Sequence, residues 1–239
     1  MALPILAVPE YEMIIPSTGE NILYRPFLVK EEKVLYIAME SNDEKETTRA
    51  IMNLLKSCII TDFNINELTT YDLEYMFLNI RAKSVNDIIK IGLKHSFSST
   101  ECNAITDVEI PLEDVKILYN EKHNNTIILD KTTKLGIELR DPCANDLSKF
   151  SSKDNDFNNM LNMITLCVKT VFDESNVYDD FDIDELKTNI LGNLNHSQLE
   201  EIMEFFNTLP KLSYTLEYTC KKCNETEETT IEGLNNFFT

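Results

Sequence analysis

The chain has 239 residues, of which 41 are Asp or Glu and 22 are Lys or Arg, so that its formal net charge at pH 7 is −19. Nucleic-acid binding depends on Lys and Arg side chains that neutralise phosphates, and this acidic balance therefore argues against nucleic acid and against an anionic membrane surface as partners. With 43% hydrophobic residues, the chain can bury one large core or two smaller ones, and wholesale disorder is excluded.

The first ten residues do not have the pattern of a secretory signal, since they lack a basic region and include Pro4 and Pro9. No apolar run reaches the roughly 18 residues that a membrane-spanning helix needs. We therefore expect no membrane span, and we expect the six cysteines to be reduced.

Residues 1–85 are predicted to form an N-terminal hairpin followed by a three-helix unit. Apolar residues around positions 11–15 and 22–24 flank a polar stretch in which Gly19 can supply the turn. Apolar residues then recur at helical spacing in three stretches. These stretches are 34–39, 51–58 and 73–80.

Residues 86–142 are predicted to be a central β section, because short apolar runs there alternate with polar residues and are separated by turn residues. The expected strands are 88–94, 107–110, 115–118, 126–129 and 135–139. Asp141 and Pro142 end this section.

Residues 143–211 are predicted to be a helical section. Residues 157–171 have a broad apolar face, and a further helix through Leu194 follows the acidic run at 179–185. The sequence from Ser197 to Glu200 has the spacing of a capping box, which predicts the start of the last helix before Pro210.

Residues 212–239 return to β-structure as a hairpin that carries a Cys-x-x-Cys sequence at its tip, and we expect this hairpin to pack with residues 86–118. The predicted fold class is therefore α+β: an N-terminal hairpin and helical unit, a central antiparallel β section with a hairpin that pairs with a C-terminal ribbon-like hairpin, and a helical insertion between them.

Cys220 and Cys223 have a metal-ligand spacing, because a two-residue gap lets both thiolates reach one tetrahedral Zn²⁺ ion. A structural site needs four ligands, and His95 and Cys102 near the tip of the earlier hairpin are the candidates for the other two. A structural zinc is accordingly the cofactor that the spacing suggests. The alternative is that the cysteine pair only packs in the core. A thioredoxin-like redox role is disfavoured, because that motif begins a helix rather than closing a hairpin.

The sequence predicts no catalytic residue. His123 is expected to be solvated in a turn, and His196 lies beside a helix cap; neither has a nucleophile motif nearby. The acidic run at 179–185 lacks the glycine and glutamate positions of a Ca²⁺ loop, which favours a solvated linker. With five glycines in all, the chain has little material for a phosphate-binding loop. Cys58, Cys143 and Cys167 are expected to be core residues.

Two segments resemble a known protein family and so carry information that composition does not. Residues 24–33 (YRPFLVKEEK), with the following helix and residues 43–46 (DEKE), resemble the N-terminal signature of the T-even-type bacteriophage baseplate hub assembly family. Residues 72–85 (DLEYMFLNIRAKSV) resemble its second signature. The similarity covers about residues 1–95, is looser at 218–238, and is weak over 120–210.

This resemblance implies a virus-encoded protein of tail morphogenesis that acts in assembly of the central baseplate hub or remains in it as a minor subunit. It implies no substrate and no reaction. The implied partners are baseplate hub subunits and, as a further candidate, the tape-measure protein. The implied location is the host cytoplasm during assembly, and the virion tail baseplate if the chain is retained there.

Four residues of the two signatures are candidates for a protein interface, namely Arg25, Phe27, Arg81 and Lys83. Arg25 would fix the approach to the first helix, with Phe27 buried, while Arg81 and Lys83 would be held either by internal carboxylates or by a partner. The alternative is that all four only specify the fold.

Three functions therefore compete at the level of sequence. The first is a non-enzymatic assembly factor or minor subunit of the hub. The second is a zinc-ribbon protein that acts as a regulatory binding module. The third is an enzyme such as a hydrolase with buried carboxylates, which predicts a pocket lined by convergent polar groups.

Overall fold

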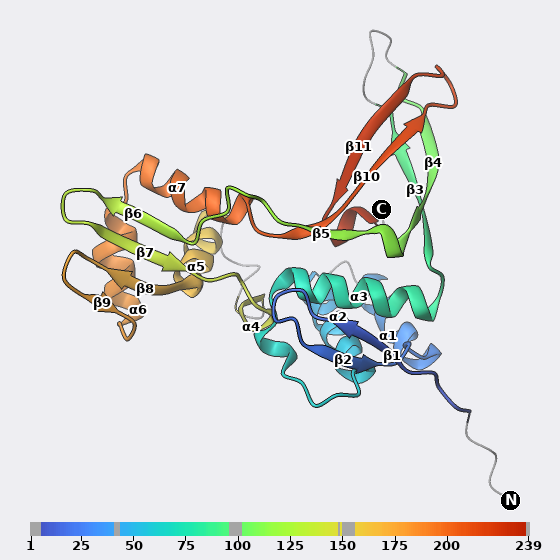
Figure 1. Ribbon diagram of the computed structural model, residues 1–239, viewed down its shortest axis with the longest axis horizontal. Coiled ribbons are helices and arrows are strands. Elements are labelled where there is room, and N and C mark those ends of the chain that lie inside the picture. Colours follow the sequence, from blue (N-terminus) through green and yellow to red (C-terminus); the bar gives the residue numbers. More distant parts are fainter. Residues whose placement is uncertain (1–5, 41–43, 96–101, 148, 150–155, 238–239) are drawn as a thin grey trace, which may run out of the picture. The chain divides into compact units, whose positions relative to one another are not determined.

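The computed structural model describes residues 6–40, 44–95, 102–147, 149 and 156–237 (Figure 1). The chain divides into two compact units. Unit 1 comprises Met1–Ile65, Tyr71–Leu118 and Lys211–Thr239, and unit 2 comprises Asn66–Thr70 and Tyr119–Pro210. Among the described residues, no helix is both long and apolar enough to cross a membrane.

Unit 1 begins with the predicted hairpin. Strands β1 (Tyr11–Ile14) and β2 (Asn21–Tyr24) pair antiparallel. Gly19 closes their turn with a φ of +71°, a left-handed conformation that glycine adopts without strain.

Three helices follow in unit 1, where the spacing predicted them. They are α1 (Val29–Glu40), α2 (Glu44–Cys58) and α3 (Thr70–Ser84), and the short 3₁₀ turn η1 (Ile65–Glu67) precedes α3. Their core includes the fully buried side chains of Leu55, Met76 and Ile80. The helical spacing of apolar residues thus predicted all three helices, and in α2 and α3 most of the residues that show it are buried, whereas Val34 of α1 is exposed.

Two further hairpins complete unit 1. Strands β3 (Ile88–Lys94) and β4 (Ile105–Pro111) form one, and β10 (Lys211–Thr219) and β11 (Thr226–Glu232) form the other. After the 3₁₀ turn η2 (Leu112–Asp114), β5 (Lys116–Leu118) pairs with β10, so that the sheet order is β11-β10-β5. The chain ends in the 3₁₀ turn η5 (Leu234–Phe237).

The two hairpins lie side by side (Figure 1) and share one hydrophobic core. Its buried members include Ile89, Ile91, Ile110, Leu112, Leu212, Ile231 and Phe237. The C-terminal hairpin therefore packs with the hairpin of residues 88–111, although 99 residues separate them in the sequence (positions 112–210).

Unit 2 contains a four-stranded antiparallel sheet in the order β6-β7-β8-β9. The strands are β6 (Thr126–Asp130), β7 (Leu135–Leu139), β8 (Val168–Phe172) and β9 (Val177–Tyr178). The helical segments are α4 (Ala144–Leu147), α5 (Asp156–Cys167), α6 (Ile183–Glu185), the π turn η3 (Leu186–Ile190), the 3₁₀ turn η4 (Leu191–Asn193) and α7 (His196–Asn207). Side chains of α5, α7 and the sheet form the core of this unit.

The α+β class is confirmed, and two details of the helical section are wrong. The predicted apolar face over 157–171 belongs to a helix only as far as Cys167, since Val168 and Val171 lie on strand β8 and pair with β7. Branched side chains at Val168, Thr170 and Val171 favour the extended chain, and pairing with β7 satisfies its backbone. A helical and a strand segment that are both apolar cannot be separated by apolar content alone.

The second wrong detail is the cap of the last helix. Asn195 rather than Ser197 is the N-cap of α7: its side chain accepts from the backbone N–H of Gln198, and the Gln198 side chain accepts from the backbone N–H of Asn195. Asn caps a helix as well as Ser, and Gln198 stands at the position that completes the box. Since β8 and β9 join the sheet, residues 119–142 and 143–210 form one unit, and position 142 does not divide compact units.

Candidate metal centre

The tips of the two hairpins of unit 1 bring together His95, Cys102, Cys220 and Cys223. Each offers one ligand atom, and these four atoms all lie within 4.8 Å of one another. His95 and Cys102 flank the tip of the β3–β4 hairpin, and Cys220 and Cys223 form the tip of the β10–β11 hairpin. The four candidate ligands that the sequence suggested are thus neighbours in the fold.

Backbone hydrogen bonds fix where these side chains start. The N–H of His95 donates to the carbonyl of Ala104 over 2.9 Å, which extends the β3–β4 pairing by one step. In the other tip, the N–H of Cys220 donates to the carbonyl of Glu225 over 2.8 Å, and the N–H of Asn224 donates to the carbonyl of Cys220 over 2.9 Å. Asn224 takes a φ of +60°, which Asn tolerates better than most residues, so the turn that carries both cysteines is tight.

The ligand atoms form two close pairs across the tips. The sulfur of Cys102 lies 3.7 Å from the sulfur of Cys220, and the sulfur of Cys223 lies 3.4 Å from Nδ1 of His95. Both close pairs join one hairpin to the other. His95 and Cys220 are buried, whereas Cys102 and Cys223 are half-buried. All three cysteines are free thiols.

The outward nitrogen of His95 faces carboxylates. Its Nε2 lies 3.8 Å from Oε2 of Glu225 and 3.7 Å from Oε2 of Glu227. The hydroxyl of Tyr218 donates to Glu227 over 2.9 Å and holds this carboxylate in place. Burial and the hydrogen bond to Glu227 raise the pKa of Tyr218 to about 12, so the phenol stays a donor.

The tip backbone favours a thiolate at Cys220. Hydrogen bonds from the backbone N–H groups of Cys223 and Lys222 lower the pKa of Cys220 to about 6. At Cys223, the backbone hydrogen bond at Glu225 lowers the pKa, but burial and the neighbouring sulfurs of Cys220 and Cys102 outweigh it and raise the value to about 11. The backbone of this turn therefore stabilises a negative charge on the Cys220 sulfur.

Sequence reasoning missed the carboxylates behind His95. Glu225 and Glu227 are two residues apart around the start of β11, and alternate residues of an extended chain share a face. That alternation directly after Cys223 was a usable signal, since a histidine that binds metal commonly has a carboxylate behind its other nitrogen.

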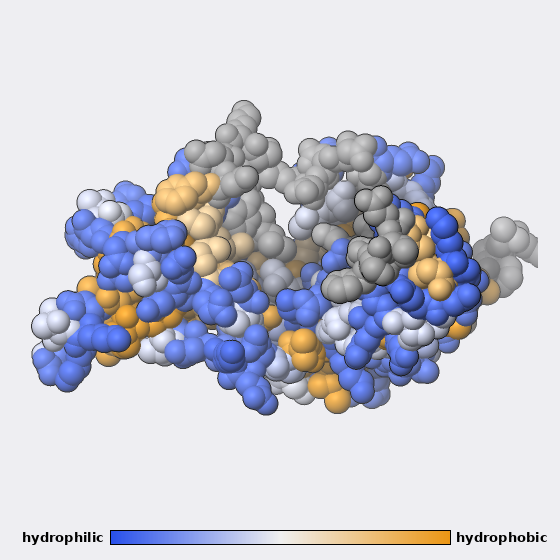
Figure 2. Space-filling view, turned by 90° about the horizontal axis from the view of Figure 1, so that it is seen from above, coloured by the Kyte–Doolittle hydropathy of each residue, from blue (hydrophilic) through white to orange (hydrophobic). Residues whose placement is uncertain are grey.

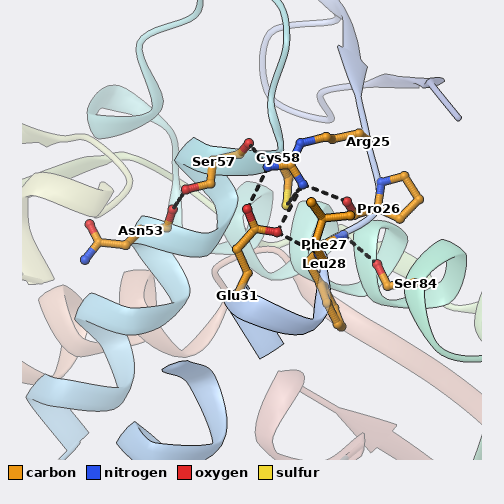
Figure 3. Close-up of polar contacts among 9 residues, drawn as sticks. All are labelled: Arg25, Pro26, Phe27, Leu28, Glu31, Asn53, Ser57, Cys58 and Ser84. Atoms are coloured by element: carbon orange, nitrogen blue, oxygen red, sulfur yellow. Dashed lines mark hydrogen bonds and ion pairs between the residues drawn. The ribbon is translucent and has the colours of Figure 1, made fainter. Parts of the chain in front are cut away.

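Arg25 is held inside unit 1 (Figure 3). Its guanidinium donates to both carboxylate oxygens of Glu31 over 3.0 and 2.7 Å, and also to the carbonyls of Pro26 and Ser57. The side-chain hydrogen bond between them raises the pKa of Arg25 and lowers that of Glu31. Phe27 is buried, and its N–H donates to the hydroxyl of Ser84 over 2.9 Å. These contacts join the end of β2 to all three helices.

The other two interface candidates lie on the last turn of α3. Arg81 is half-buried; burial lowers its pKa, and the nearby Tyr36 and Glu32 of α1 act in the opposite direction. Lys83 is exposed, with its Nζ 5.6 Å from the centre of the Tyr11 ring. Whether any of the four candidates contacts a partner remains a prediction.

The expectation that His123 is solvated is wrong. Its ring is only partly exposed: Nδ1 lies 3.0 Å from the hydroxyl of Thr208, and the ring centroid lies 4.9 Å from that of Phe205. The end of α7 therefore covers this turn. His196 is exposed and lies 3.3 Å from a carboxylate oxygen of Glu200.

A second polar cluster, which the sequence did not point out, lies in unit 2. Arg140 donates to both carboxylate oxygens of the buried Asp146, which also accepts from the backbone N–H and the thiol of Cys143. Burial alone would raise the pKa of Asp146, but the hydrogen bonds from Arg140 and Cys143 outweigh it and lower the pKa to about 2. Arg140 also donates to the carbonyl of Leu166, and so joins β7 to α4 and α5.

Of the three cysteines expected in the core, Cys58 and Cys167 fit that role, whereas Cys143 is half-buried. Cys58 and Cys167 are fully buried, and burial raises their pKa values to about 11 and about 12. Unit 2 also has a hollow of about 330 Å³ between α5 and the turns at 186–193. It is lined by Asn158, Leu161, Asn162, Lys187, Leu191 and Gly192, and this lining contains no carboxylate, thiol or imidazole.

The fold and the site define an α+β protein of antiparallel hairpins and helices. Its polar clusters, namely the four candidate metal ligands and the pairs Arg25–Glu31 and Arg140–Asp146, connect separate structural elements. The family described as the T4 bacteriophage base plate protein matches residues 8–239, and the chain belongs to this family. The expected relation to T-even-type phage baseplate proteins is thereby confirmed. No curated protein and no solved structure matches the chain. Family membership gives the protein a structural or assembly role in the phage tail baseplate, with other baseplate proteins as its partners.

Proposed function

We propose that this protein is a non-enzymatic assembly factor or minor structural subunit of the central hub of the baseplate, and that it acts by binding other hub proteins. The observation that carries the proposal is the family match over residues 8–239, together with the hub-type signatures at residues 24–46 and 72–85. Its partners are hub subunits, with the tape-measure protein as a further candidate, and it acts in the host cytoplasm during assembly.

The distribution of polar groups supports a binding role over a catalytic one. Arg25 and Glu31, and likewise Arg140 and Asp146, pair with each other and with backbone groups, so these charges hold elements together. A catalytic site would instead aim such groups into a pocket, and the hollow in unit 2 has no such lining. Figure 2 shows hydrophilic residues over most of the face in view, with hydrophobic ones in small groups.

Exposed apolar side chains on α1 also support protein binding. Val29, Val34, Tyr36 and Ile37 are each more than half exposed. Large apolar groups exposed together are typical of protein contact surfaces. Lys83 is the exposed member of the four interface candidates and therefore the one whose substitution should disturb the fold least.

Affinity purification from infected cells tests this proposal. The tagged wild-type chain is expected to retain hub subunits, and Lys83→Glu to retain several-fold less at an unchanged melting temperature. Lys131→Glu makes the same charge change at an exposed position of unit 2 and serves as the control. Mass spectrometry of purified virions then separates the two fates, since an assembly factor leaves the particle and a subunit stays. A wild-type chain that retains no baseplate protein contradicts the proposal.

The cluster at the hairpin tips favours a second candidate, a zinc-ribbon module that regulates partner binding. This candidate differs in one respect: metal loading would switch partner capture on or off. Comparing capture by the metal-loaded protein and by the chelator-treated protein separates it from a hub role that does not depend on metal.

A further inference from the structure

The donor atoms at the hairpin tips are spaced as the ligands of one tetrahedral ion. With bonds of about 2.3 Å to sulfur and about 2.0 Å to nitrogen, a tetrahedral ion places two sulfurs about 3.8 Å apart and a sulfur and a nitrogen about 3.5 Å apart. The observed separations are 3.7 Å between Cys102 and Cys220 and 3.4 Å between Cys223 and Nδ1 of His95. The other four separations are at most 4.8 Å, and all of them except that between His95 and Cys220 involve the half-buried Cys102 or Cys223.

The donor set selects the metal. Three thiolates and one imidazole are soft or borderline ligands, which disfavours Mg²⁺ and Ca²⁺ because these ions take oxygen ligands. Tetrahedral sites of this composition bind Zn²⁺. All four positions are filled by protein groups, so the site has no open position for a water or a substrate, and it is of the structural kind.

The surroundings of the cluster match those of a metal site. The backbone N–H groups in the Cys220–Cys223 turn point toward the Cys220 sulfur, and such hydrogen bonds stabilise a ligating thiolate. With Nδ1 of His95 facing the sulfurs, its Nε2–H faces Glu225 and Glu227, which is the carboxylate–histidine–metal arrangement. Core packing alone explains neither feature.

The tips also need a cross-link. The two hairpins belong to different sheets, and among the described residues no ladder pairs β3 or β4 with β10 or β11. Among the described residues, the polar contacts between the tips outside the cluster are long: Lys221 N–H to the Thr106 hydroxyl at 3.4 Å, Lys222 Nζ to the Cys102 carbonyl at 3.5 Å, and Lys221 Nζ to Asp107 at 3.9 Å. These contacts are too long to hold the tips firmly.

We propose that His95, Cys102, Cys220 and Cys223 bind one structural Zn²⁺ ion that joins the tip of the β3–β4 hairpin to the tip of the β10–β11 hairpin. All three cysteines bind as thiolates, so binding displaces whichever thiol protons remain, and His95 binds as the neutral imidazole through Nδ1. The ion thereby connects segments that are 118 to 128 residues apart in the chain. This inference does not depend on the hub role, because it concerns the free chain.

Metal analysis of the full-length protein, expressed in zinc-supplemented medium and purified without chelator, tests the proposal. We expect about one zinc per chain. After replacement by Co²⁺, we expect the visible bands of tetrahedral cobalt and the charge-transfer bands of thiolate ligands. Less than about 0.2 zinc per chain, both as purified and after reconstitution with Zn²⁺, overturns the proposal, because a four-ligand site of this kind binds zinc tightly. A Cys102–Cys220 disulfide in protein kept under reducing conditions overturns it as well.

Variants identify the ligands. Cys223→Ser and His95→Ala are expected to lose the bound metal, whereas His95→Cys is expected to keep zinc in a four-sulfur site. Cys143→Ser is the matched control, since it removes a half-buried thiol in unit 2 and keeps a hydroxyl donor for Asp146. Full zinc occupancy in the double variant Cys220→Ser, Cys223→Ser contradicts the assignment. If a variant fails to fold, the cobalt spectrum of the wild type still decides the case.

Discussion

The sheet of unit 2 and the two adjacent hairpins of unit 1 bury their apolar residues in different ways. In unit 2, buried residues from β6, β7, β8, α5, the turns at 186–193 and α7 form one core beneath the sheet. In the hairpins of unit 1, the buried apolar residues of the strands gather at one end: Ile89, Ile91 and Ile110 meet Leu212 and Ile231 there. Toward the tips, the buried side chains are instead those of Thr106, Tyr218, His95 and Cys220.

This difference indicates where a protein of this kind needs a polar cross-link, namely where its apolar core ends. A helix laid on a sheet excludes water along its whole length, whereas two narrow hairpins side by side cover each other only where large apolar side chains are available. Beyond Ile91 and Ile110, the apolar residues that still pack against this core, such as Leu93, Val108 and Leu216, are only partly buried. The metal site that we propose lies at the end that the apolar core does not reach.

Removal of the metal should produce the largest difference between the hairpins of unit 1 and the sheet of unit 2. With a chelator, amide hydrogen exchange in β3, β4 and the outer halves of β10 and β11 should accelerate by more than tenfold, because free energies of several kcal/mol depend on a structural zinc. Exchange in β7 and β8 should not change. Readdition of zinc should restore protection, and equal acceleration in both units would contradict the distinction between them.

A cavity in the core of unit 2 should have the next largest effect. Phe205 is 2% exposed in that core, and Phe205→Ala should lower the free energy of unfolding of this unit by about 4 kcal/mol. Denaturant titration followed by exchange or fluorescence in unit 2 measures it. The zinc content should stay at the wild-type value, and a loss of zinc would show that the two units are not independent.

Asp146→Asn tests the polar cross-link between Asp146 and Arg140 in unit 2. Removing the charge leaves Arg140 without its carboxylate, and the expected loss is about 3 kcal/mol. The pKa of Asp146 is about 2 in the folded chain against a usual 3.8, so its stabilisation is complete above pH 4 or so and is lost as the pH falls from 3.8 toward 2. The stability difference between wild type and variant should therefore shrink over this range. A difference that is constant from pH 6 to pH 2 would exclude this ionisation as the source.

Arg25→Ala tests a polar cross-link in unit 1 that needs no metal. Arg25 and Glu31 are mostly buried, with side chains 19% and 12% exposed, and the substitution should cost about 2 kcal/mol. Arg25→Lys keeps the charge but cannot donate to both oxygens of Glu31, so it should recover only part of the loss. Thermal unfolding measures both variants. Zinc content that stays constant in both would separate this clamp from the hairpin tips.

The sequence predicted local structure well where one periodicity prevailed. Gly19 and the apolar spacing of the three helices were sufficient for residues 11–84, and in α2 and α3 most of the residues that show the pattern are buried in the core. The prediction was wrong at Val168 and Val171, where an apolar helix runs directly into an apolar strand without a breaker between them. It was also wrong at His123, because only the tertiary fold brings Thr208 and Phe205 against that turn.

In the candidate site, too, some features could be predicted from the sequence and others could not. The Cys-x-x-Cys sequence and the position of His95 and Cys102 at a hairpin tip suggested a four-ligand set, since hairpin tips are predictable from local turns. The distances between the two tips depend on packing between segments more than 100 residues apart, which no local pattern specifies. The pairing of Arg140 with Asp146 and of Arg25 with Glu31 likewise depends on how elements pack, and composition only showed that carboxylates were plentiful.

X-ray absorption at the zinc edge of the purified protein tests the central claim most directly. Our account predicts a first shell of three sulfur atoms at about 2.3 Å and one nitrogen at about 2.0 Å, with the outer-shell scattering of one imidazole. A shell made only of oxygen and nitrogen atoms, or protein that takes up no zinc, would contradict it.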